Sequence, residues 1–129
     1  MDAAQALADL TEISSQIEAA VLFDEQGAVQ GSTLADGAAA VDLARGAVDL
    51  LQRAGGFRSE GRVTQLEAAT DSGSVFVVSD GDRRIAATTG PQPTVGLVFY
   101  DLKSALRNAR AQEEKPKRTP RRKKADTEA

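Results

Sequence analysis

The chain has 129 residues, which is enough for one domain with one core. Its hydrophobic content of 41% is ordinary, but its aromatic content of 4% is low, so alanine, valine and leucine must fill the interior. The absence of cysteine excludes disulfides, thiolate metal sites and a cysteine nucleophile, and the sequence contains no histidine either. The first residues lack the basic start and apolar core of a signal peptide, and no apolar run approaches a membrane span. We therefore expect a soluble, cytoplasmic protein.

Charge divides the chain into two pieces. Seven of the 16 basic residues lie in Lys115–Lys124, so the preceding 114 residues carry nine basic and 17 acidic side chains, a net charge of −8. An acidic body followed by a basic tail indicates two functional parts.

The first elements are a helix and a hairpin. Apolar residues at helical spacing predict a helix over Ala3–Ser14. The stretch Val21–Ser32 is the most informative in the chain, because an apolar run meets an Asp/Gly turn and returns through a more polar run. It predicts a β-hairpin with strands at Ala20–Phe23 and Ala28–Ser32, joined through Asp24–Gly27.

A second helix should begin after Asp36, its N-cap, and run to about Ala54, where Gly55 and Gly56 end it. Its apolar residues sweep about 200° of the helix circumference, whereas a helix packed on one sheet needs a stripe of about 100°. The excess favours a second contact, such as a closely approaching helix. The alternative is that alanine is simply a good helix former that tolerates exposure.

Three strands and a last helix follow. Arg62–Thr70 alternates irregularly and predicts a half-buried edge strand, Ser74–Ser79 a central strand, and Arg84–Thr89 its hairpin partner. The last helix is expected over Thr94–Ala111, although the start of this segment has the composition of a strand. From Gln112 onward apolar residues nearly vanish and Pro116 and Pro120 interrupt any helix. We therefore predict a single α/β domain over 1–111, with one mixed sheet of about five strands, and a disordered basic tail over 112–129.

The search for chemistry finds little. No Gly-x-x-x-x-Gly-Lys-Ser/Thr phosphate loop is present. The sequence Asp80-Gly81-Asp82 lacks the rest of a calcium loop and is interpreted as a hairpin turn. Four arginines lie in expected loops or at strand starts, where an exposed guanidinium group can act as an arginine finger on a partner protein. The alternative is a role in solubility and ordinary ion pairing. These residues are Arg58, Arg62, Arg83 and Arg84. We predict no catalytic residue, cofactor, metal or small-molecule substrate.

The order helix, two strands, helix, three strands, helix resembles the roadblock/dynein light chain family. The resemblance covers about Ala4–Ala109 and is carried by Ala20-Val-Leu-Phe-Asp-Glu-Gln-Gly and Pro93-Thr-Val-Gly-Leu-Val-Phe-Tyr-Asp-Leu. The basic tail is not part of the family pattern. The resemblance implies a profilin-like or longin-like sandwich, a homodimer or heterodimer in which the second helices pack side by side and the third strands pair at their edges, and a scaffolding or regulatory role toward a small Ras-like GTPase.

Two functional hypotheses follow. The first is a non-catalytic dimeric scaffold or regulator of a small Ras-like GTPase, with an interface formed by Ala40, Val41, Leu43, Ala44, Ala47, Val48, Leu50, Leu51, Val63 and Gln65. The alternative is a dimeric binder of an anionic surface, membrane or nucleic acid, acting through Lys115, Lys117, Arg118, Arg121, Arg122, Lys123 and Lys124.

Overall fold

The computed structural model describes residues 2–57 and 62–118, with side chains described as far as residue 109. These residues form three helices and five strands. The elements are α1 (Ala3–Ile13), β1 (Ile17–Asp24), β2 (Val29–Ser32), α2 (Gly37–Gly55), β3 (Gln65–Thr70), β4 (Gly73–Asp80), β5 (Arg83–Thr89) and α3 (Val95–Arg118). The strands make one sheet in the order β2-β1-β5-β4-β3.

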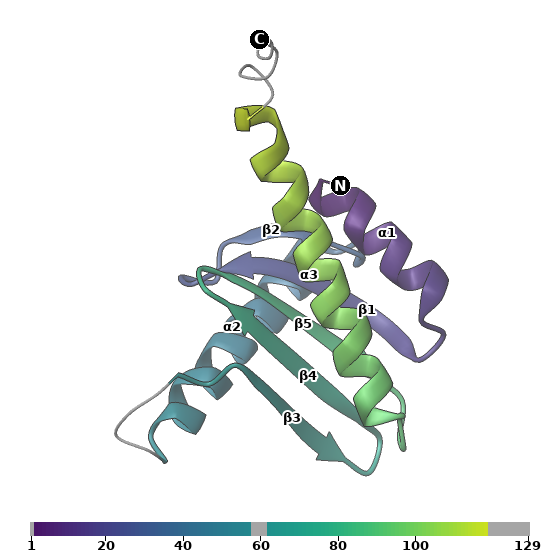
Figure 1. Ribbon diagram of the computed structural model, residues 1–129. Coiled ribbons are helices and arrows are strands. Elements are labelled where there is room, and N and C mark those ends of the chain that lie inside the picture. The colour runs from purple at the N-terminus through teal and green to yellow at the C-terminus, as the bar shows by residue number, and fades with distance from the viewer. Residues whose placement is uncertain (1, 58–61, 119–129) are drawn as a thin grey trace, which may run out of the picture.

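The molecule has three layers, with α1 and α3 on one face of the sheet and α2 on the other (Figure 1). Strand alternation divides the core accordingly. Leu22, Ile85 and Val78 occupy one cross-strand row and face α1 and α3, while Val21, Ala86 and Val77 occupy the next row and face α2. Both faces of the central strands are therefore buried, which explains their nearly continuous apolar sequences.

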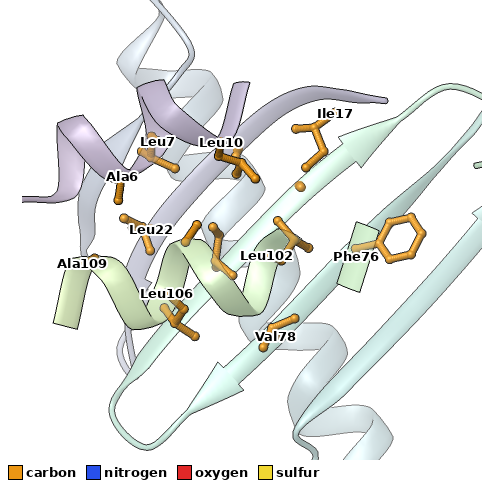
Figure 2. Close-up of a cluster of buried hydrophobic side chains, with 14 of the residues drawn as sticks. Ala6, Leu7, Leu10, Ile17, Leu22, Phe76, Val78, Leu102, Leu106 and Ala109 are labelled. Atoms are coloured by element: carbon orange, nitrogen blue, oxygen red, sulfur yellow. The ribbon is translucent and has the colours of Figure 1, made fainter. Parts of the chain in front are cut away.

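The larger core cluster lies between the sheet and the α1/α3 layer. Figure 2 shows Leu7 and Leu10 of α1, Leu102 and Leu106 of α3 and Leu22 of the sheet gathered in one cluster. These side chains are fully or almost fully buried. At the same face, the ring of Phe76 meets that of Phe99 edge to face, with centroids 5.0 Å apart. Two aromatic rings and several leucines thus fix the two helices on the sheet.

The ends of helix α2 and the turn between β1 and β2 follow the expected local chemistry. Asp36 caps α2, its Oδ1 accepting a hydrogen bond of 2.9 Å from the Ala38 N–H. The β1–β2 turn is held by Asp24, whose Oδ1 accepts from the N–H groups of Gln26 and Ala28, both at 2.9 Å. Helix α2 ends at Gly55, as predicted, although Gly56 adopts a right-handed conformation with φ −70°.

The α/β class, the order of elements and the edge position of the third strand are confirmed. The sheet differs from the mixed one that we expected, because every neighbouring pair of strands is antiparallel. A parallel pair requires a long crossover between neighbours. The one crossover through a helix between strands, α2, joins β2 and β3, which lie at opposite edges.

The predicted last helix is confirmed as α3, and its first turns are helical and not the alternative strand. Its end differs from the prediction, because the backbone remains helical to Arg118, beyond the expected end at Ala111. The predicted domain boundary at Gln112 therefore falls inside the helix. Extending an existing helix costs little for Gln and Glu, which are good helix formers. Pro116 opposes the extension, since a proline inside a helix removes a backbone hydrogen bond and crowds the carbonyl group four residues before it. Residues 119–129 of the predicted tail lie outside the described residues.

The two edges of the sheet are unlike each other. Strand β2 has four residues, and its pairing with β1 is irregular between Leu22 and Phe23. Helix α1 lies close against it, since a methyl group added at Gly31 would come within 3.1 Å of the Ala3 Cβ. Strand β3 has six residues in regular register with β4, and no described strand pairs with its outer edge.

Candidate functional site: helix α2 and the edge of strand β3

The centre of the predicted interface is internal to the subunit. Ala40, Ala44, Ala47 and Leu51 pack on the sheet beneath α2, and the most exposed of them, Leu51, is only 7% exposed. Side chains already buried in their own subunit cannot also meet a partner. The surface available on α2 is therefore narrower than the sequence predicted, and it is confined to the two flanks of this buried stripe.

One flank carries Val41 and Val48, which lie about 70–90° from the buried stripe at 100° per residue. Val41 is 36% exposed, and Val48 is half-buried. The β1–β2 turn partly covers this flank, because a methyl group added at Gly27 would lie 3.5 Å from a methyl of Val48. Arg45 and Gln52, both exposed, continue the same side of the helix. This flank is thus partly covered and partly polar.

The opposite flank is open and largely apolar. It contains Ala39, Leu43, Gly46 and Leu50, at successive spacings of four, three and four residues, the spacing of a coiled-coil seam. Leu43 and Leu50 are half-buried, and we call these four residues the α2 seam. The seam points about 100° away from the buried stripe. It therefore faces sideways along the sheet, the direction from which a second helix in the same layer would approach.

Gly46 is the least expected residue of the α2 seam. Glycine in a helix interior costs about 1 kcal/mol relative to alanine. Nothing in the subunit requires glycine there, since a methyl group at Gly46 would meet no other atom within 4 Å and the backbone φ is not positive. A glycine that its own chain does not need is typical of a place where another backbone approaches closely.

Strand β3 lies on the same side of the molecule as the α2 seam. Helix α2 packs on β1, β2 and β5, so the seam, which faces away from the β1–β2 turn, points toward the half of the sheet that ends in β3. On this face Leu66 and Ala68 are half-buried, as is Val63, which precedes the strand. Gln65 is exposed on the opposite face, in the row of Val78. The alternation of Leu66 and Ala68 with polar residues contributed to the prediction of an edge strand, but the predicted interface did not include these two residues.

The arginines considered as arginine fingers differ in their exposure to solvent. Arg83 is 6% exposed and Arg84 is half-buried, so the expectation of exposed guanidinium groups is wrong for this pair. Both stand at the start of β5. Arg62 is exposed, and Arg58 lies outside the described residues. Within the described part of the chain, no group of three or more metal-ligating side chains is placed to hold an ion.

The predicted basic tail is described only in its backbone and only in part. Lys115, Lys117 and Arg118 belong to the last turns of α3, which run past the sheet (Figure 1). The other four cations, Arg121, Arg122, Lys123 and Lys124, lie outside the described residues.

Comparison with solved structures decides the fold. A Roadblock/LC7 domain from Streptomyces avermitilis superposes with a TM-score of 0.77, covering 88% of this chain and 99% of that chain at 22% identity. The chain has the roadblock/LC7 fold. The gliding protein MglB of Thermus thermophilus matches with a TM-score of 0.66, 20% identity and coverage of 87% and 89%. An MglB solved in a tetrameric arrangement matches with a TM-score of 0.68, 19% identity and coverage of 87% and 88%.

The comparison of structures confirms the roadblock resemblance at the level of the fold. No protein-family model matches the sequence, and no curated protein matches it. The described helices include none that combines the length and the apolar character needed to cross a membrane.

Proposed function

We propose that this chain is a non-catalytic, dimeric scaffold or regulator of a small Ras-like GTPase. The observation that carries the proposal is the open α2 seam beside the unpaired edge of β3, with Gly46 at its centre. The roadblock/LC7 fold supports self-association, since a protein of the same fold, MglB, has been solved in a tetrameric arrangement.

The dimer forms about a two-fold axis beside β3. Pairing of β3 with its copy satisfies the free backbone groups of both edges, and extends the sheet to the partner. The α2 helices of the two copies then lie in one layer, seam against seam. In a single subunit, α2 leaves Leu66 and Ala68 half-exposed. In the dimer, Leu43 and Leu50 of one copy fill the space above these two residues of the composite sheet. Gly46 allows the two backbones to approach at the crossing.

The regulatory role follows from what such a dimer offers. It presents two copies of a rigid sheet and no histidine or cysteine to act as a base or nucleophile. The GTPase as partner rests on the resemblance to roadblock proteins and is an argument by analogy. A regulator of this kind contacts the switch loops that the γ-phosphate orders, and therefore favours one nucleotide state.

The test is direct binding to the small GTPase encoded nearest to this chain. Isothermal titration with the GTPase loaded with GDP, and separately with a non-hydrolysable GTP analogue, should give a complex that prefers one state. This protein alone should hydrolyse no nucleotide. Strong hydrolysis by the isolated protein, or failure to bind any encoded GTPase in either state, would contradict the proposal.

A second function, binding to an anionic surface, is favoured by one observation. The last turns of α3 carry Lys115, Lys117 and Arg118 beyond the sheet on a helical extension, and four further cations follow in the sequence. Near anionic lipid each cation contributes about 1 kcal/mol. A chain ending after Gln112 should then lose binding to acidic vesicles while keeping its protein partner, and equal vesicle binding by both forms would place any anion site on the body.

A further inference from the structure

Arg84 is the most unusual side chain of the sheet. It lies on the face of the sheet covered by α2, in the row of Phe23 and Ser79, and the next residue of β5 on this face is the buried Ala86. Its Nη1 donates a long hydrogen bond of 3.3 Å to the carbonyl oxygen of Glu25. Its Nε is buried and has no hydrogen-bond partner. A buried donor without an acceptor is destabilising, so it calls for a partner such as an ion or a ligand.

A cavity of about 290 Å³ adjoins this guanidinium group. Leu51 and Gly55 of the last turns of α2 form one wall, Val63 forms another, and Arg62 and Arg84 supply two cationic groups. Since a water molecule takes up about 30 Å³ of the liquid, the cavity has room for an ion of five heavy atoms together with several waters. Its composition is that of a small polar pocket with an apolar wall.

The charged groups around the cavity have a net positive charge. No carboxylate of a described residue forms an ion pair with Arg62 or Arg84. The carboxyl end of α2 contributes about half a negative charge. Two of its carbonyl groups are already occupied, because Arg53 and Ala54 accept backbone hydrogen bonds from Gly56 and Phe57. Glu25, which also lines the cavity, is exposed to solvent, so water screens its negative charge.

We propose that this cavity binds an oxyanion group, a phosphate or a carboxylate, through Arg84 and Arg62. Nε and Nη2 share one edge of a guanidinium group, and this edge binds phosphate and carboxylate oxygens in pairs. Nε of Arg84 is closed off in the present arrangement, so the ligand draws the side chain toward the cavity and gives Nε its missing acceptor. Arg62, at the exposed mouth, adds a second, screened charge. The site depends on neither the dimer nor the GTPase.

The experiment uses the full chain, labelled with ¹⁵N, and titrates it with inorganic phosphate and separately with succinate. Chloride keeps the ionic strength constant, so that only specific binding changes the spectrum. The Nε–H resonance of Arg84 and the backbone amides of Gly55 and Val63 should shift together and saturate. Saturation by phosphate alone identifies a phosphate ligand, and saturation by succinate alone a carboxylate. Saturation by both supports the shared chemistry, and saturation by neither overturns the proposal.

Three variants locate the site. Arg84→Gln should weaken binding about 10- to 100-fold, the effect of losing a charge-assisted hydrogen bond. Arg62→Gln should weaken it about two- to fivefold, as expected for an exposed charge. Arg45→Gln, which removes an exposed charge from the outside of α2, should leave binding unchanged. Equal affinity in all three variants contradicts the assignment. If Arg84→Gln fails to fold, the Arg84 resonance in Arg62→Gln still decides the question.

Discussion

Replacing Gly46 with alanine distinguishes two explanations for the apolar α2 seam. Either the seam packs against a second helix, or it is an exposed flank with no partner. In an isolated subunit the change is favourable, because alanine gains about 1 kcal/mol over glycine in a helix interior. The added methyl group meets nothing within 4 Å, so no steric cost offsets this gain. For a domain of this size the melting temperature should rise by about 4 °C.

In the proposed dimer the same change is unfavourable. Each subunit contributes one new methyl group to the crossing of the two α2 helices, and overpacking a closely fitted contact costs about 1–3 kcal/mol. The dissociation constant should therefore rise about 5- to 150-fold. Gly46→Ala is thus expected to give a more stable subunit and a weaker dimer, a combination that a general structural defect does not produce.

Sedimentation equilibrium over a range of concentrations measures the dimer, and urea unfolding below the dissociation constant measures the subunit. Gly96→Ala is the matched control, because Gly96 lies in α3 and is equally open. It should not change the dissociation constant. If Gly46→Ala stabilises the protein and leaves the dissociation constant unchanged, the α2 helices do not pack along this seam and the reasoning fails.

Three further outcomes are expected. Leu50→Glu should convert the dimer of 13.5 kDa subunits into folded monomers, whereas Val41→Glu on the opposite flank should leave it dimeric; light scattering after gel filtration measures both, and the reverse pattern would assign the partner to the other flank. Ending the chain after Gln112 should change the calorimetric melting temperature little, because the residues removed contain almost no apolar side chains; a large drop would show that the end of α3 is part of the folded unit. Leu102→Ala, at a fully buried site, should cost about 2–5 kcal/mol in chemical denaturation, and a loss below 1 kcal/mol would mean that α3 is not anchored at this point.

Local chemistry made much of the fold predictable. The turn at Asp24–Gly27 and the cap at Asp36 are governed by hydrogen bonds within a few residues, and the structure contains both as expected. The direction of strand pairing was not predictable in this way. It depends on which strands become neighbours across the whole sheet, and the α2 crossover carries β3 to the far edge.

The candidate site was predicted only in part, because the burial of a helix face also depends on which elements become neighbours. A helical wheel gives the width of an apolar arc but not the place where the sheet lies beneath it. The structure shows that the sheet buries the middle of the arc, including Ala44, and leaves the flanks. Gly46 was passed over because a single glycine among alanines carries no periodic signal. The position of Arg84 beneath α2 depends on the pairing of β5 with its neighbours, which the sequence does not reveal.

The unlike edges of the sheet limit how far copies of this chain can assemble. A sheet with two long free edges can add strands indefinitely, which is the geometry of fibre growth. Here β2 is short and irregularly paired, so among the described strands only β3 offers a regular row of free backbone groups. Two copies that meet at β3 use up that row in each other. In the proposed dimer, growth through strand pairing therefore ends at two subunits, so an edge that permits association does not lead to polymerisation.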